Sequence, residues 1–446
     1  MFTYDVAIIG AGAGGLNTAM EAASMGKKVV LVDKYKPGGE CTWAGCIPSK
    51  AIIQLADEIH TAKKYANIEV DGKQIMSKVR QLIKKAHQAE AVEQLQAAGI
   101  EYIQGDAKIN DQHSIRVVDK IITAENIVIA TGSRALIPSI KGIDQVNYLT
   151  NENVFQLEDL PKNLIVVGGG PIGVELTQAF QRLGVQVKLV EMADRILFRE
   201  EKGLAHQLQS TLEEEGVQLY TSAKALEVKQ ANGTTTLTIN RNDVLEHIEA
   251  EHILFALGRK PNIENIGLDD LGICYTNKGI EVNEYNETSV RNIYAVGDAV
   301  GPYLFSHMAG FQAKQAMRHA FLEMHTPIEQ HPAWCTFTHP ELARTGMTEN
   351  EAREKFQDKF NVYTVSYSEL DRAVVDQKTT GEAKIICDQD GFIIGASILG
   401  ERACELLGEL QLMKTFHIPF RKLKDTIHPY PSYSEILTQL SNVATE

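Results

Sequence analysis

Residues 4–33 read YDVAIIGAGAGGLNTAMEAASMGKKVVLVD, and residues 163–191 repeat the same pattern as NLIVVGGGPIGVELTQAFQRLGVQVKLVE. In each segment an apolar run predicts a strand, a glycine-rich turn opens a helical stretch, and a second apolar strand ends in a carboxylate. The matching positions keep one constant offset: Gly10, Gly12, Gly15, Gly26 and Asp33 correspond to Gly168, Gly170, Gly173, Gly184 and Glu191. The chain therefore contains an internal duplication.

The duplicated unit is typical of a Rossmann-type dinucleotide-binding fold. A glycine-rich turn alone is weak evidence, but each turn here follows a strand and precedes a carboxylate by about 20 residues, as ribose recognition requires. Glycines let the backbone approach a pyrophosphate, whose charge then faces the amides at a helix N-terminus. Two copies predict two bound dinucleotides. Glu191 would accept a hydrogen bond from a ribose 2′-hydroxyl and repel a 2′-phosphate, which favours NAD over NADP, although Arg195 is close enough in sequence to reach a phosphate.

A cysteine motif, PGGECTWAGCIPSK at residues 37–50, follows the first unit and precedes a helical pattern. It places Cys46 at a helix N-terminus, where exposed amides and the helix dipole lower the pKa of a thiol. Lys50 lies one turn further on the same face and adds positive charge. Zinc binding is the alternative, but a second Cys or His pair with suitable spacing is missing from the sequence. The other cysteines are isolated along the chain and are expected to be buried packing residues: Cys274, Cys335, Cys387 and Cys404.

Composition narrows the class of partner. The 446 residues include 44 Lys and Arg against 58 Asp and Glu, and the net charge of −14 argues against a nucleic-acid or anionic-membrane partner. The sequence has no run of about 18 apolar residues that would predict a transmembrane helix, and its start leaves no room for a secretory signal. We therefore expect a cytoplasmic protein with no nucleic-acid or membrane partner.

The motif GGEC-x4-CIPSK resembles the redox motif of the class I pyridine nucleotide-disulfide oxidoreductases, which include dihydrolipoamide dehydrogenase, glutathione reductase and mercuric reductase. Other segments resemble this family along the whole chain: ATG at 130–132, GRKPN at 258–262, YAVGD at 294–298 and FTHPE at 337–341. The resemblance implies an α/β fold with two Rossmann-like dinucleotide-binding domains, for FAD and NAD, and a C-terminal α+β dimerisation domain. The implied division is residues 1–145 and 273–331 for FAD, 146–272 for NAD(P) and 332–446 for dimerisation.

The resemblance also implies roles for individual residues. Cys46 would be the thiolate that contacts the flavin, and Cys41 the interchange thiol that meets the substrate. Lys50 and Glu175 would lie together near flavin N5, and Asp298 would bind the FAD ribityl chain. The expected cofactor-binding residues are Gly10, Gly12, Gly15, Asp33, Lys34, Gly39, Thr131, Gly132, Gly168, Gly170, Gly173, Glu191, Gly258, Arg259, Gly297 and Asp298. No metal ligand is expected.

The C-terminal segment departs from the family pattern. Dihydrolipoamide dehydrogenases and glutathione reductases carry a histidine with a glutamate five positions later, whereas here Tyr430 takes the histidine position and Glu435 is kept. A phenol with a pKa near 10 is a poor proton acceptor at neutral pH. His428 is the other candidate base, against a role as a surface or hydrogen-bonded interface residue. Mercuric reductases also carry tyrosine at this position, which favours metal ions or other unusual acceptors.

Two further positions are unusual for the family. Pro171 stands where many relatives place an aromatic residue that gates the nicotinamide pocket. Trp43, between the two cysteines, either narrows access to Cys41 or packs.

The leading interpretation is an NADH-linked flavoprotein disulfide reductase of the dihydrolipoamide dehydrogenase type. It would form a homodimer, in which the C-terminal domain delivers Tyr430 and Glu435 to the disulfide of the other copy. Its substrate would be a small-molecule disulfide or dithiol. A metal-ion or quinone reductase is the first alternative, and a non-catalytic flavoprotein subunit the second. The intact cysteine pair with Lys50 and Glu175 argues against the second alternative.

Overall fold

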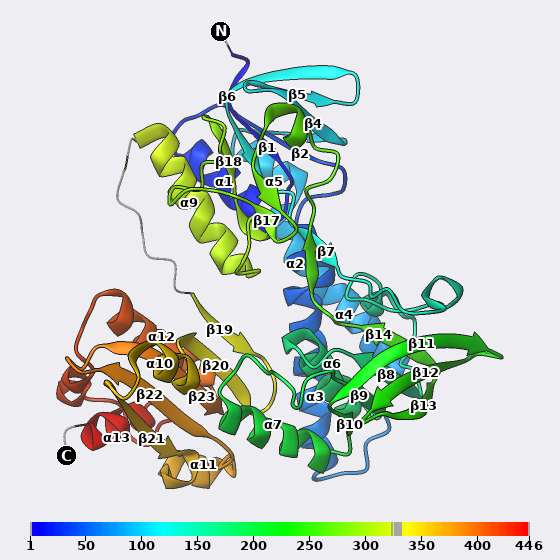
Figure 1. Ribbon diagram of the computed structural model, residues 1–446, viewed down its shortest axis with the longest axis vertical. Coiled ribbons are helices and arrows are strands. Elements are labelled where there is room, and N and C mark those ends of the chain that lie inside the picture. Colours follow the sequence, from blue (N-terminus) through cyan, green and yellow to red (C-terminus); the bar gives the residue numbers. More distant parts are fainter. Residues whose placement is uncertain (1, 323, 325–331, 445–446) are drawn as a thin grey trace.

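The first part of the chain forms a sheet with the strand order β3-β2-β1-β6-β5-β4 (Figure 1). The computed structural model describes residues 2–322, 324 and 332–444. The strands of this sheet are β1 (Tyr4–Ile9), β2 (Val29–Asp33), β3 (Ile100–Gln104), β4 (Ala107–Asp111), β5 (Ser114–Val117) and β6 (Lys120–Ile129). β18 (Ile293–Ala295) adds in parallel beside β6, so a segment that follows the second glycine unit completes the first sheet. The helices of this part are α1 (Ala13–Ser24), α2 (Gly39–Ala44), α3 (Cys46–Lys63), α4 (Gly72–His87), α5 (Val92–Ala97) and α9 (Ser306–Leu322).

The second glycine unit builds a separate parallel sheet with the order β10-β9-β8-β14. Its elements are β8 (Asn163–Val167), α6 (Pro171–Arg182), β9 (Gln186–Val190), α7 (Lys202–Glu214), β10 (Gln218–Tyr220) and β14 (His252–Phe255). An antiparallel sheet of β11 (Ala223–Ala231), β12 (Thr234–Arg241) and β13 (Val244–Ala250) lies beside it (Figure 1). The chain enters through β7 (Ser133–Ala135) and returns through β15 (Arg259–Pro261), and these two strands pair with each other. The helix α8 (Leu268–Leu271) and the hairpin β16 (Tyr275–Thr276) and β17 (Gly279–Ile280) lead back to the first sheet.

The C-terminal part is an antiparallel sheet with the order β19-β20-β23-β22-β21, covered by helices. Its strands are β19 (Ala333–Thr336), β20 (Glu341–Gly346), β21 (Phe360–Ser366), β22 (Glu382–Asp388) and β23 (Ile393–Gly400), and its helices α10 (Glu349–Phe356), α11 (Asp371–Asp376), α12 (Ala403–Thr415) and α13 (Glu435–Val443). Leu407 and Leu410 of α12 and Ile436 and Leu437 of α13 are buried in one core with the sheet. The predicted α/β class, with two dinucleotide-type sheets and an α+β C-terminal part, is confirmed.

The predicted domain boundaries stay predictions. The strand β18 and the paired β7 and β15 agree with a first domain that is interrupted by the second. Residue 331, the predicted end of the second FAD segment, lies outside the described residues. Within the described part of the chain, no helix is long and apolar enough to cross a membrane.

The two glycine turns have the same backbone geometry because the same close contact forms each of them. Gly10 and Gly168 have φ of +106° and +116°, in a region that residues with a side chain rarely adopt. A Cβ atom on Gly15 would lie 1.7 Å from the carbonyl oxygen of Gly10, and one on Gly173 would lie 1.9 Å from that of Gly168. Each helix therefore starts directly against the end of its strand.

We expect Gly15→Ala to destabilise the protein by about 1–3 kcal/mol, because the new methyl group must push α1 away from the turn. Gly203→Ala is the matched control: its Cβ would meet no atom within 4 Å, so the change should be neutral or slightly stabilising. Thermal unfolding of the two variants measures the difference. Equal unfolding temperatures would contradict the close contact.

Candidate active site

A cavity of about 3090 Å³ connects the two glycine turns and also contains the cysteine motif. Single small-molecule sites are usually about 300–1,000 Å³, so this space is large enough for more than one ligand. The predicted cofactor residues on its wall are Gly12, Asp33, Lys34, Gly39, Thr131, Gly132, Gly168, Gly170, Glu191, Gly258, Arg259, Gly297 and Asp298. Gly10, Gly15 and Gly173 lie behind this wall and shape the turns. The cavity is thus lined by the residues that a dinucleotide site needs.

The two strand-end carboxylates hold their glycine turns in equivalent ways. Asp33 Oδ2 accepts a hydrogen bond from the Ala11 amide at 2.6 Å, and Glu191 Oε2 accepts one from the Gly169 amide, also at 2.6 Å. Because a carboxylate oxygen has further lone pairs, both groups can still accept a hydrogen bond from a ribose hydroxyl. Arg195 also lines the cavity, where its guanidinium donates to the Phe198 carbonyl oxygen at 2.6 Å.

The backbone of the cysteine motif lies directly against the first glycine turn. A Cβ atom on Gly39 would lie 2.4 Å from the Cα of Gly12, so position 39 leaves no room for a side chain. Both glycines line the cavity, where bare backbone can approach a ligand closely. This slot fits the pyrophosphate of a dinucleotide such as FAD.

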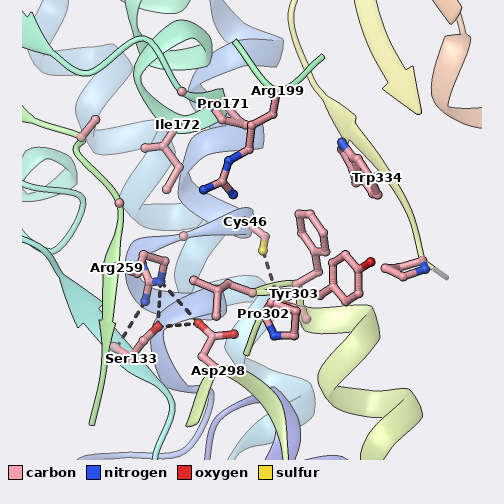
Figure 2. A pocket seen from close by; sticks show the side chains of 18 of the residues that line it. Cys46, Ser133, Pro171, Ile172, Arg199, Arg259, Asp298, Pro302, Tyr303 and Trp334 are labelled. Carbon is pink, nitrogen blue, oxygen red and sulfur yellow. Dashed lines mark hydrogen bonds and ion pairs between the residues drawn. The ribbon is translucent and has the colours of Figure 1, made fainter. Parts of the chain in front are cut away.

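Cys46 is the first residue of α3, as the sequence predicts, and its side chain points into the cavity (Figure 2). The thiol of Cys41 donates a hydrogen bond to the Cys46 sulfur, and this bond is the main reason why the pKa of Cys46 falls to about 6. Burial opposes this shift, while Ser306, whose Oγ lies 3.5 Å from the sulfur, and the charge of Lys50 support it. The same hydrogen bond raises the pKa of Cys41. At neutral pH the reduced pair is therefore a Cys46 thiolate beside a Cys41 thiol.

Lys50 and Glu175 form an ion pair of 2.8 Å between α3 and α6. The second oxygen of Glu175 accepts a hydrogen bond from the Phe337 amide at 2.9 Å. The ring of Phe337 lies 4.3 Å from the Lys50 ammonium, as a cation–π contact. Helices from both nucleotide units and the start of the C-terminal part thus fix this cation on the wall of the cavity.

Arg259 joins two carboxylates from distant segments, and Figure 2 shows its contacts with Ser133 and Asp298. It donates to Glu40 at 2.7 Å and to Asp298 Oδ2 at 3.3 Å, and Ser133 Oγ also donates to Asp298 Oδ2, at 2.5 Å. The sequence reasoning selected Arg259 and Asp298 but missed Glu40 and Ser133 as their partners. Its place inside the cysteine motif could have drawn attention to Glu40. Nothing in the sequence around Ser133 indicates its role.

The three C-terminal candidates lie away from this cavity in the described chain. The phenol of Tyr430 is exposed and donates to Asp371 Oδ2 at 2.8 Å, which raises the pKa of Tyr430. His428 lies between Glu409, at 3.2 Å from Nε2, and a threonine hydroxyl of α13. Glu435 is the first residue of α13. A single chain therefore does not bring these side chains to Cys41 and Cys46.

Trp43 and Pro171 both lie on the wall of the cavity. Trp43 also packs: its Nε1 donates to the Pro37 carbonyl oxygen at 2.8 Å, and its ring lies 4.4 Å from that of His87. Both interpretations of Trp43 thus have support. Pro171 begins α6, next to the half-exposed Ile172 (Figure 2).

The expectation that the remaining cysteines are isolated packing residues is wrong for three of them. Cys387 is buried as expected, but Cys274 is exposed. Cys335 and Cys404 contact each other and line the cavity, because β19 and α12 are neighbours in the C-terminal part. Their separation along the chain hid this contact.

Comparison with known proteins gives the class. The family model described as pyridine nucleotide-disulphide oxidoreductase matches residues 4–320, and the model for the dimerisation domain of the same family matches residues 332–441. The chain belongs to this family, as its motifs predicted. It is a flavoprotein oxidoreductase, and FAD and NAD(P) are its cofactors.

Individual relatives cover nearly all of the chain. It is 32% identical to a dihydrolipoyl dehydrogenase of Geobacillus stearothermophilus, over 99% of this chain and 96% of that protein. It is 30% identical to a mercuric reductase of Bacillus cereus, over 97% of this chain and 70% of that protein. Among solved structures, the HOCl-induced flavoprotein disulfide reductase RclA of Escherichia coli superimposes with a TM-score of 0.89 at 26% identity, covering 99% of this chain and 100% of the other. LpdA of Mycobacterium tuberculosis superimposes with a TM-score of 0.90 at 27% sequence identity, covering 98% of this chain and 99% of the other.

Proposed function

We propose that this protein uses NADH to reduce a small-molecule disulfide, by way of FAD and the Cys41–Cys46 pair. The observation that carries the proposal is the asymmetric cysteine pair at the start of α3, with a Cys46 pKa of about 6 and a raised Cys41 pKa. It lies in the same cavity as both glycine turns and the Lys50–Glu175 ion pair. A reactive thiolate between two dinucleotide sites is suited to receive electrons and pass them to a disulfide.

Individual residues of this chain would have separate roles in the proposed reaction. FAD, when bound, supplies the carrier that takes electrons from NADH and gives them to the cysteines. Cys46 would face the flavin, because its side chain points into the cavity and its thiolate is stabilised by the Cys41 thiol, by Lys50 and by the α3 N-terminus. Cys41, which keeps its proton, would exchange with the substrate disulfide. Asp298 would bind the ribityl chain, next to Ser133 and Arg259.

We propose that the working form is a cytoplasmic homodimer. The dimerisation-domain match over residues 332–441 supports two copies. The side chains of Ile427 and Tyr430 are 97% and 69% exposed, as residues of a segment that contacts a second copy would be in a single chain. In the dimer, this segment would bring Tyr430 and Glu435 to the cysteine pair of the other copy, with His428 as the competing candidate base.

NADH should be the better electron donor. Glu191 favours a ribose hydroxyl over a phosphate, and Arg195 is occupied by the Phe198 carbonyl oxygen, so we expect kcat/KM for NADH to exceed that for NADPH by about tenfold or more. Steady-state kinetics with both donors measures this ratio. Equal efficiencies that become unequal in Arg195→Ala would show that Arg195 turns to the phosphate.

Reduction of a soft metal ion is the second candidate function. It is favoured by the Cys46 thiolate, which a ligand can reach from the cavity, and by Tyr430, whose raised pKa makes it a poor base for dithiol chemistry. The relatives include a mercuric reductase, and RclA has been solved as a Cu(II) complex with a TM-score of 0.88 to this chain.

One acceptor panel tests both functions. NADH oxidation is followed with glutathione disulfide, coenzyme A disulfide, lipoamide, Hg²⁺, Cu²⁺ and a quinone, in wild type and in the variant Cys41→Ser. Disulfide reduction that disappears in Cys41→Ser supports the proposal. Turnover with metal ions alone would replace it by the second candidate.

A further inference from the structure

A second pair of thiols lies on the wall of the same cavity. Cys335 belongs to β19 and follows Trp334, which stands on this wall in Figure 2, and Cys404 is the second residue of α12. Both cysteines line the cavity, and their side chains are close enough for each thiol to shift the pKa of the other. Two such neighbouring cysteines can be joined by a disulfide where their Cα and Cβ atoms also lie within bonding range.

The scaffold around this pair holds both cysteines at one carboxylate. The backbone amide of Cys404 donates to Glu341 Oε2 at 2.9 Å. Glu341 begins β20, the strand that pairs with β19, and Cys335 lies opposite Ala343 in that pairing. Two backbone contacts that do not involve sulfur thus bring the cysteines together.

The two thiols are chemically unequal. The hydrogen bond from Cys335 lowers the pKa of Cys404, whereas burial and the negative charges of Glu341 and Glu405 oppose this shift. The positive charge of Lys50 supports it. The interaction with Cys404 and burial raise the pKa of Cys335, whose thiol donates a hydrogen bond to the Thr336 carbonyl oxygen at 3.4 Å. The pKa of Cys404 is thus shifted down and that of Cys335 up, the same directions as for Cys46 and Cys41. The thiolate is the attacking species in thiol–disulfide exchange, so the sulfur with the lower pKa is expected to attack first.

A metal site explains the pair less well. Within the described residues, no group of three or more His, Cys, Asp or Glu side chains is arranged to hold a metal ion. The structure therefore favours redox chemistry of the sulfurs themselves.

We propose that Cys335 and Cys404 are a second redox-active dithiol, which closes to a disulfide by exchange with a small-molecule disulfide. The Cys404 thiolate attacks one sulfur of the disulfide, whose S–S bond breaks, and one thiolate leaves. Cys335 then loses its proton and attacks the Cys404 sulfur, and the second thiolate leaves. The two cysteines lose two electrons, the small disulfide gains them, and the protons end on the two released thiols.

The second cysteine pair lies close to the Lys50–Glu175 ion pair of the active site. Cys335 is two residues before Phe337, whose amide holds Glu175 and whose ring contacts Lys50. The disulfide would tie β19 to α12 beside this ion pair, and it would remove the Cys404 thiolate from the field of Lys50. Formation of the disulfide would therefore depend on how oxidised the surrounding small thiols are, and it would change the wall of the active site accordingly.

The test uses the full-length, FAD-loaded Cys41→Ser/Cys46→Ser variant, so that the first pair cannot react and the result does not depend on the proposed function. The protein is incubated with oxidised glutathione, remaining thiols are blocked with N-ethylmaleimide, and peptides are mapped by mass spectrometry. We expect the Cys335 and Cys404 peptides to be joined by a disulfide, and to be released by dithiothreitol. Cys274, an exposed thiol, and Cys387, a buried one, are the internal controls and should form no such link.

Single variants test which sulfur attacks. In Cys335→Ser, one glutathione should stay on Cys404, because the resolving thiol is missing. In Cys404→Ser, Cys335 should remain unmodified. The proposal is overturned if Cys335 and Cys404 remain fully available to N-ethylmaleimide, or if Cys404 keeps glutathione while Cys335 is present. The parent variant alone gives these two outcomes if a single variant fails to fold.

Discussion

Cys46→Ser is expected to abolish both disulfide reduction and the long-wavelength charge-transfer absorption that a thiolate gives next to FAD. Cys41→Ser should also end disulfide turnover, but it should keep the absorption band, because a serine hydroxyl can still donate the hydrogen bond that stabilises the Cys46 thiolate. The band should appear as the pH rises through about 6, since the depressed pKa leaves the thiolate present above that value. Absorption spectra of the NADH-reduced variants between pH 5 and 8 measure both effects.

Cys274→Ser is the control for these spectra, because this thiol is exposed and lies outside the lining of the cavity. It should keep the band and the turnover of the unaltered protein. A band that survives in Cys46→Ser and disappears in Cys41→Ser would mean that the roles of the two sulfurs are reversed.

Tyr430→His is expected to raise the oxidation rate of dihydrolipoamide by about 10²- to 10⁴-fold, the usual contribution of a positioned general base. The tyrosine has a raised pKa, and its hydroxyl donates a hydrogen bond to Asp371, so the neutral phenol cannot readily take a proton from a thiol. An imidazole at this position could be oriented by Glu435. The reduction of the flavin by NADH should change little, because Tyr430 is not part of the cavity wall of its own chain. Stopped-flow and steady-state rates separate these two half-reactions.

His428→Ala is the comparison for this gain. His428 is held by Glu409 and Thr438, which suits a structural role, and its loss should affect dithiol turnover less. A collapse of turnover in His428→Ala, together with no gain in Tyr430→His, would identify His428 as the base and overturn the assignment of Tyr430.

The sequence predicts the two nucleotide units well because their geometry depends on local requirements. The turn at Gly10 needs a positive φ, and Gly15 must lie close to the carbonyl oxygen of Gly10. Asp33 must reach the backbone amide of Ala11. These residue types therefore recur at a fixed spacing. The place of Cys46 could be predicted for the same reason, because the cysteine motif runs directly into α3 along the sequence. The family resemblance extended these local patterns to the whole fold.

Contacts between distant segments could not be predicted in this way. The Glu40–Arg259–Asp298 group depends on how three segments meet, and Cys335 and Cys404 meet only through the packing of α12 on β19. Such pairs leave no periodic signal in a single sequence. The proposed approach of Tyr430 and Glu435 to the cysteines would require a second copy of the chain, which a single chain does not contain.

The most direct test of the account is a count of the thiols that anaerobic NADH produces in the oxidised, FAD-loaded protein. NADH is added in steps, new thiols are trapped with a labelled maleimide, and the labelled cysteines are identified by peptide mapping. We predict two new thiols for the first equivalent of NADH oxidised, located at Cys41 and Cys46. Oxidation of NADH with bleaching of the flavin, but without new label on Cys41 and Cys46, would contradict the claim that electrons pass from NADH through FAD to this pair.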